Sequence, residues 1–153
     1  YFLIGYFDMN YEHRFRVEAA LSRVRDFHSR AESMAAITPP PVFVKMRSTP
    51  ATLNENDIMD FTMWMGPLPI HWTARIERVT ETGFSDRQIR GPFAHWLHRH
   101  TFAAVNEQTT EVVDEITVKL SHHPLWWLVG MFMWLGLPFL FTYRGWKTKR
   151  MLK

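Results

Sequence analysis

Cysteine is absent from this chain of 153 residues, and glycine occurs only 7 times. The absence of cysteine excludes disulfides and thiolate metal ligands, and it leaves the redox compartment undetermined. Neither sign of charge dominates, since 18 basic residues stand against 15 acidic ones, a net charge of +3 with histidine neutral. So small an excess gives no case for nucleic acid as a partner. No internal repeat or low-complexity linker divides the chain, which predicts a single domain.

Apolar side chains are plentiful: 46% of the residues are hydrophobic and 15% are aromatic. This composition excludes a disordered chain, and a domain of this length buries roughly 70% of its unfolded surface. The sequence from Met9 onward reads like a natural start, so we expect residues 1–8 to be an upstream extension or a cloning remnant. Residues 9–153 are then the domain. Residues 1–8 lack the basic segment and small-residue cleavage site of a signal peptide.

Hydrophobic periodicity changes along the chain. Residues 13–18 alternate as a strand, residues 19–30 have helical spacing, and a second short helix ends at Thr38-Pro39-Pro40-Pro41, where prolines cannot continue it. Six further segments read as strands joined by short turns, at residues 42–47, 58–65, 70–80, 83–90, 94–105 and 109–120. The uncharged residues 124–143 predict one long closing helix. This order predicts an α+β fold.

Two of the predicted strands carry polar groups on mostly apolar faces. Trp96, His98, His100 and Phe102 are spaced two apart, so an extended strand points all four the same way. In the next strand Asp114 shares a face with apolar residues. Counting through the turn at residues 106–108 places His100 opposite Asp114, so a carboxylate could fix the imidazole tautomer.

A longer motif runs through the whole chain in a fixed order. It consists of Thr38-Pro39-Pro40; Trp72, Ala74 and Ile76; Phe84, Asp86 and Gln88; Gly91-Pro92-Phe93, Trp96, His98, His100 and Phe102; Thr110 and Asp114; and Tyr143-Arg144. With it, the chain resembles the SRPBCC superfamily, the START-like or helix-grip fold, and specifically its small bacterial polyketide-cyclase-like members. The resemblance implies a curved antiparallel sheet of six or seven strands around a long C-terminal helix, with a ligand cavity between them. Fold alone does not fix function.

We expect a binding module that sequesters or presents a small hydrophobic molecule: a lipid, isoprenoid, quinone or polyketide-like compound. The candidate ligand contacts are Met63, Trp72, Trp96, His98, His100, Phe102 and Asp114. The alternative is a cyclase or dehydratase in which His100 is the base and Asp114 holds its tautomer. A purely structural polar cluster explains the same residues. We expect no cofactor and no metal, because a His–Asp hydrogen bond accounts for the set without the two-His-one-carboxylate site that His98, His100 and Asp114 could form.

Three features stay open at this point. One face of the predicted strand at residues 83–90 carries Asp86, Gln88 and Arg90. If this face points inward, the three side chains are candidate ligand contacts; if it points outward, they form a solvent-exposed row. The stripe Met59, Phe61, Met63 and Met65 is either plain core or an adaptable cavity wall. The basic residues at the end of the chain predict a solvated helix terminus, in Arg144, Lys147, Lys149, Arg150 and Lys153.

The closing helix meets the length criterion for spanning a bilayer, which is about 20 apolar residues. If it left to span a membrane, the sheet would lose its cover, so we expect it to be buried in the grip. A peripheral membrane contact or a homodimer through this helix is the alternative. Accordingly we expect a cytoplasmic protein or one peripheral at the membrane, with no nucleic-acid partner.

Overall fold

The computed structural model describes residues 7–153. The expectation that residues 1–8 form an extension therefore lies almost wholly outside the described residues. The first element begins at Met9, and just before it the carboxylate of Asp8 lies 3.7 Å from Lys119 Nζ.

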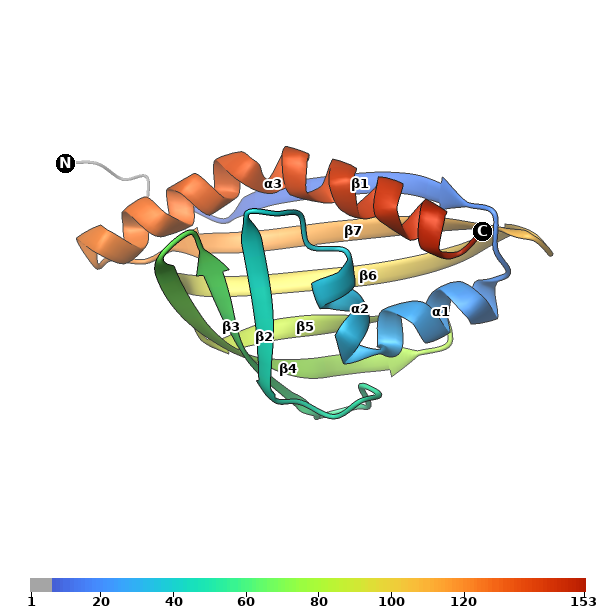
Figure 1. Ribbon diagram of the computed structural model, residues 1–153, viewed down its shortest axis with the longest axis horizontal. Helices are drawn as coiled ribbons and strands as arrows, with labels where there is room; N and C mark the ends of the chain where they lie inside the picture. Colours follow the sequence, from blue (N-terminus) through green and yellow to red (C-terminus); the bar gives the residue numbers. More distant parts are fainter. Residues whose placement is uncertain (1–6) are drawn as a thin grey trace.

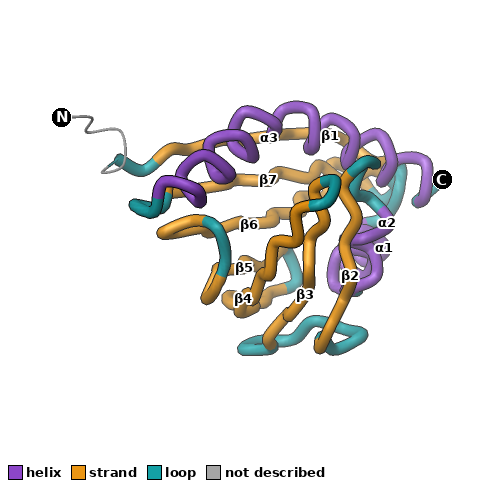
Figure 2. The backbone as a smooth tube through the Cα atoms, turned by 60° about the vertical axis from the view of Figure 1, so that its left-hand side comes forward, coloured by secondary structure: helices purple, strands orange, loops and turns teal. Residues whose placement is uncertain are grey.

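Seven strands form one antiparallel sheet, and three helices lie against it (Figure 1). In chain order the elements are β1 (Met9–Val17), α1 (Leu21–Ser29), α2 (Ala31–Ala36), β2 (Val42–Ser48), β3 (Ile58–Met65), β4 (Leu68–Thr80), β5 (Gly83–Arg90), β6 (Phe93–Asn106), β7 (Thr109–Leu120) and α3 (Pro124–Met151). The strand order is β1-β7-β6-β5-β4-β3-β2. The sheet bends around the long C-terminal helix (Figure 2), so the predicted α+β helix-grip architecture is confirmed.

The largest difference from a predicted strand boundary is at the start of β1. β1 begins at Met9 rather than at residue 13, because it pairs with β7 along its whole length, from Met9 opposite Val118 to Val17 opposite Thr110. α3 extends beyond the uncharged residues 124–143 to Met151, so the basic residues form its C-terminal end, as the prediction of a basic helix terminus implied. Lys149 and Arg150 lie in its last turn, where cations suit the helix dipole.

The inner face of α3 packs on the sheet. Val129, Leu137 and Phe141 are buried, and Leu137 and Phe141 join the core formed with Val112 and Ile116 of β7. In both views α3 runs along β1 and β7, whereas α1 and α2 cover the other part of the concave face (Figures 1 and 2).

The outer face of α3 is apolar and exposed. Leu125, Leu128, Phe132, Leu135 and Phe139 are between 50% and 71% exposed and follow each other at spacings of three and four residues. We call these five residues the outer stripe. Within residues 7–153, α3 alone is long and apolar enough to cross a membrane, by length and composition. The expected burial therefore holds for one side of the helix only.

Candidate functional site

A cavity of about 860 Å³ lies between α3, the region of α2 and the concave face of the sheet. Most of its wall is apolar, with methionines and aromatics from β3 and β4 facing apolar residues of α3. Met59, Phe61, Met63 and Met65, whose role was left open, all line it. At one end the wall becomes polar, because Asp86, His98, His100, Arg144 and His28 meet there.

The predicted ligand contacts divide into two groups. Met63, Trp72, Trp96, His98 and His100 line the cavity, whereas Phe102 and Asp114 do not. Phe102 is 1% exposed, with its ring centroid 4.9 Å from that of His28. Asp114 is 5% exposed and lies behind the two imidazoles, away from the cavity.

Strand register brings the polar groups together. β6 lies between β5 and β7, so Asp86 is opposite His98 on one side, and Asp114 is opposite His100 on the other. Both imidazoles therefore sit between two carboxylates. The ring centroids are 3.8 Å apart, and Phe84 stacks on the ring of His100 at 4.4 Å.

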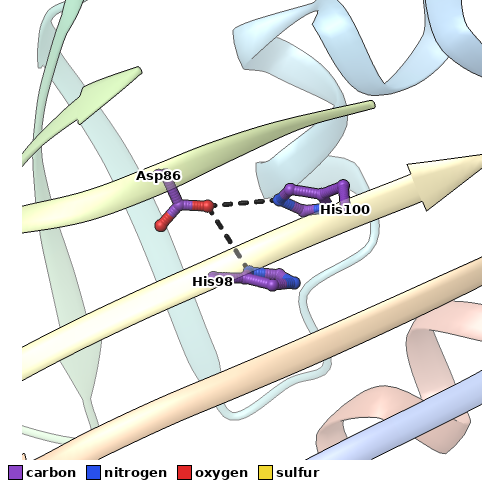
Figure 3. Close-up of side chains that lie close together, drawn as sticks. All are labelled: Asp86, His98 and His100. Atoms are coloured by element: carbon purple, nitrogen blue, oxygen red, sulfur yellow. Dashed lines mark hydrogen bonds and ion pairs between the residues drawn. The ribbon is translucent and has the colours of Figure 1, made fainter. Parts of the chain in front are cut away.

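Hydrogen bonds cross the register diagonally. His98 Nε2 donates to Asp114 Oδ1 over 2.8 Å, and His100 Nε2 donates to Asp86 Oδ2 over 3.1 Å. His98 Nδ1 lies 3.4 Å from the same Asp86 oxygen (Figure 3). His100 Nδ1 lies 3.1 Å from Asp114 Oδ1, an ion-pair distance without the alignment of a hydrogen bond. The predicted pair His100–Asp114 is thus adjacent, but the best hydrogen bond to Asp114 comes from His98.

The carboxylates set the charges of the imidazoles. Burial alone would lower the pKa of His100, but hydrogen bonding and charge from Asp114 and Asp86 raise it to about 9. Burial and the neighbouring His100 instead lower the pKa of His98, against the pull of both carboxylates. Burial would raise the pKa of Asp86 and Asp114, yet the two imidazoles hold both below the usual range. Near neutral pH, His100 is charged and His98 is neutral.

The prediction that the basic residues at the end of the chain are solvated is wrong for Arg144. Its side chain lines the cavity, and its Nε is buried without a hydrogen-bond partner among residues 7–153. Its guanidinium carbon lies 5.4 Å from the centroid of the Phe141 ring. Burial lowers its pKa, but Asp114 and Asp86 counteract this, and a guanidinium stays charged. Two carboxylates then balance two cations, Arg144 and His100. Lys149, Arg150 and Lys153 are exposed, as predicted, whereas Lys147 is half-buried.

Sequence reasoning left Asp86 undecided and missed His28. Of the open trio, only Asp86 reaches the cavity: Gln88 exchanges two hydrogen bonds with the backbone of Phe93, and Arg90 is exposed. His28 Nδ1 donates to the carbonyl of Val24 over 2.8 Å, and burial together with the charge of His100 lowers its pKa to about 4. The four-residue spacing from the apolar Val24 could have placed His28 on the inner face of its helix.

The arrangement can orient and polarise a bound molecule. Charged His100 can donate a proton or a hydrogen bond, but it cannot accept a proton, so it is poorly suited to be a general base. Neutral His98 already donates its N–H to Asp114. Arg144 offers free N–H donors to a carbonyl, carboxylate or phenolate oxygen.

Searches for relatives by sequence found no matching family model and no matching curated protein. The structure, however, is similar to many solved ones. A norcoclaurine synthase from Thalictrum flavum, in complex with dopamine and hydroxybenzaldehyde, superposes with a TM-score of 0.70 at 12% identity, over 95% of this chain and 86% of that one. The Zhui aromatase/cyclase from Streptomyces sp. R1128 gives a TM-score of 0.68 at 14% identity, over 95% and 96%.

Protein CV1439 from Chromobacterium violaceum gives a TM-score of 0.68 at 10% identity, over 92% of this chain and 98% of that one. These structures have helix-grip folds of the SRPBCC type, so the resemblance drawn from the motif is confirmed for the fold. Identities this low show the fold alone.

Proposed function

We propose, on the premise of a helix-grip fold, that this chain binds one small, mostly apolar molecule in its cavity, with an oxygen-bearing end against Arg144 and the histidines. The observation that carries the proposal is the cavity itself: about 860 Å³, apolar along its length and polar at one end. Ligand pockets of small molecules typically measure about 300–1,000 Å³ and combine apolar walls with a few fixed polar groups. A lipid, isoprenoid, quinone or polyketide-like compound has the matching shape.

The wall chemistry supports an apolar occupant. Trp72 and Trp96 meet edge to face at 5.2 Å, which gives one side of the cavity a rigid surface. Met63 and Met65 line the same sheet wall from the neighbouring strand β3, and methionine adapts to irregular shapes. A wall with rigid and adaptable parts favours a class of similar ligands over a single compound.

The polar end supports a fixed orientation. Arg144 lines this end and forms no hydrogen bond among residues 7–153, and holding its charge in a mostly apolar cavity without a partner is costly. A ligand oxygen that accepts its N–H removes that cost. The ligand head therefore lies beside Arg144 and its tail beside Met63 and Trp72.

Two of the similar structures are a norcoclaurine synthase and an aromatase/cyclase, so a cyclase-type reaction is the natural alternative. The electrostatics argue against the version in which His100 is the base, because its raised pKa of about 9 keeps it protonated. Binding needs no such step, and we therefore favour binding.

A fluorescence titration with an apolar probe tests the proposal. Gly136 lines the cavity, and a Cβ added there would meet open space, so Gly136→Phe should fill the cavity without clashing with the core. We expect the wild-type protein and Gly136→Ala to bind the probe, and Gly136→Phe to bind at least tenfold more weakly. Equal binding by all three proteins would refute a cavity site.

A second proposal concerns where the ligand enters. Leu128, Phe132 and Phe139 belong to the exposed outer stripe and also line the cavity, so its mouth opens beside the stripe. Contiguous exposed apolar surface marks an interaction site. Exposed Trp146 and then Lys149, Arg150 and Lys153 follow the stripe along the same helix. Apolar contact followed by basic residues suits an anionic membrane surface, and we propose that α3 docks there to exchange the ligand.

Vesicle sedimentation separates this docking from dimerisation. Leu135 is 71% exposed and does not line the cavity, so Leu135→Glu should abolish sedimentation with vesicles containing anionic lipid. Val105→Glu, at an exposed residue of β6, is the matched control and should sediment like the wild type. The membrane proposal fails if the wild type does not sediment with vesicles and is instead a dimer that Leu135→Glu dissociates. In that case the outer stripe contacts a second copy of the chain.

A further inference from the structure

We infer that Asp86, His98 and His100 form a binding site for one divalent transition cation, with Zn²⁺ as the reference ion, and that the site opens into the cavity. The three ligand atoms are Asp86 Oδ2, His98 Nδ1 and His100 Nε2, and they come from adjacent strands β5 and β6 (Figure 3). Two imidazoles and one carboxylate are donors that suit such ions. The sequence alone pointed to Asp114 as the carboxylate of such a set; the structure points to Asp86.

The spacing of the donors fits one ion. All three atoms lie within 4.8 Å of one another, with Asp86 Oδ2 3.1 Å from His100 Nε2 and 3.4 Å from His98 Nδ1. With metal–ligand bonds of about 2.1 Å, two donors are about 3.0 Å apart at a right angle and about 3.4 Å apart at the tetrahedral angle. Both measured separations fall in this range, so the two pairs need little rearrangement.

Asp114 has the position of an outer-sphere partner. Its Oδ1 accepts the N–H of His98 Nε2 at 2.8 Å and lies 3.1 Å from His100 Nδ1. A carboxylate on the far nitrogen of an imidazole fixes its tautomer and ring orientation. In His98 this leaves Nδ1 free for a metal, whereas His100 Nε2 carries the proton that it donates to Asp86. The two carboxylates thus have different places: Asp86 faces the cavity with the histidines, and Asp114 is closed off behind them.

Rigidity and access complete the site. The donors lie on central strands of a sheet, and Phe84 stacks on His100 at 4.4 Å, so the rings are held in place. Asp86, His98 and His100 all line the cavity, so any remaining coordination position faces it. Three protein ligands with an open position are typical of metal centres that bind a further molecule. For the cation to enter, the proton on His100 Nε2 has to leave.

Titration of the chelator-treated, full-length protein with Co²⁺ alone tests the inference, because bound Co²⁺ absorbs visible light according to its coordination. We expect one Co²⁺ per chain, displaced by Zn²⁺, with the spectrum of a nitrogen- and oxygen-ligated ion. Asp86→Asn should weaken binding at least tenfold, and Asp114→Asn should weaken it about 10- to 100-fold.

The control is the double variant His122→Gln/His123→Gln, which removes two adjacent histidines outside the cavity and should bind Co²⁺ like the wild type. The inference fails if the wild type binds no Co²⁺, if Asp86→Asn binds it unchanged, or if the double variant loses it. The circular dichroism of each variant checks its fold. A chain that binds the apolar probe but not Co²⁺ would overturn this inference alone, because the cavity proposal does not depend on the cation.

Discussion

His98 Nε2 lies 2.8 Å from Asp114 Oδ1, and both side chains are less than a tenth exposed. The same carboxylate oxygen also lies 3.1 Å from His100 Nδ1. One buried carboxylate therefore holds two imidazoles, and a second, Asp86, faces them from the cavity side. The polar end of the cavity depends on this pairing.

Asp114→Asn should destabilise the fold strongly. The substitution keeps the shape of the side chain but leaves positive His100 with one carboxylate, and breaking a buried ion pair costs about 3–5 kcal/mol. Chemical denaturation measures the loss. Glu115→Gln, one residue along β7 and exposed, is the matched control and should change the unfolding free energy by less than about 0.5 kcal/mol. A loss below about 1 kcal/mol for Asp114→Asn would mean that the carboxylate is dispensable.

Stability should fall on both sides of a pH near 6.5. The pKa of His100 rises from 6.5 to about 9 on folding, so its contribution is complete below pH 6.5 and is lost as the pH rises to about 9. The pKa of His28 falls from 6.5 to about 4, so its contribution is present above pH 6.5 and is lost as the pH falls to about 4. Denaturation curves across this range give the profile.

One variant separates the two sides of this stability profile, the acid limb below pH 6.5 and the alkaline limb above it. His28→Leu removes one of the two buried imidazoles with lowered pKa, so it should make the acid limb shallower, with His98 accounting for the remainder, and leave the alkaline limb unchanged. An alkaline limb that stays flat up to pH 9 in the wild type would show that His100 does not hold its proton in the fold.

Arg144→Met should change the choice of ligand. The variant removes the buried guanidinium at the polar end but keeps an apolar side chain of similar length. We expect an acid-headed fatty probe to bind at least tenfold more weakly, and its alcohol-headed analogue to change by less than threefold. Arg150→Met, at an exposed residue of the same helix, should alter neither affinity. Equal losses for both probes would assign Arg144 a packing role only.

Two glycines of α3 should respond in opposite ways to leucine. A Cβ at Gly130 would lie 3.1 Å from Leu120 Cδ2 and 3.2 Å from Phe93 Cε1, so Gly130→Leu overpacks the interface and should cost about 1–3 kcal/mol. At Gly136 a Cβ meets open space, and losing a helical glycine stabilises by about 0.5–1 kcal/mol. Thermal unfolding of the two variants compares them. Equal destabilisation would mean that the space beside Gly136 is closed.

Local patterns predicted much of the fold. Alternating residues and turn residues identified the strands, and counting through the β6–β7 turn put His100 opposite Asp114, the register that the structure has. The diagonal bond from His98 to Asp114 depends on side-chain rotamers, which a register does not specify. Asp86 could not be placed, because the inward face of β5 is decided by its pairing with β6 and not by its own alternation.

The closing helix was harder to interpret for a different reason. A segment that is apolar on every side has no periodicity from which to read its buried face. The outer stripe therefore became visible only once Leu137 and Phe141 were seen packed on the sheet. Arg144 was grouped with the exposed basic residues by composition, although it lies about one turn after the buried Phe141 and points into the cavity.

Whether the cavity holds a molecule is tested most directly by native mass spectrometry of the protein purified from cells, followed by solvent extraction. The account predicts a small apolar compound, released on denaturation, at up to one per chain in the wild type and greatly reduced in Gly136→Phe. A wild-type chain that carries nothing, and that takes up no apolar probe when one is supplied, would contradict the account.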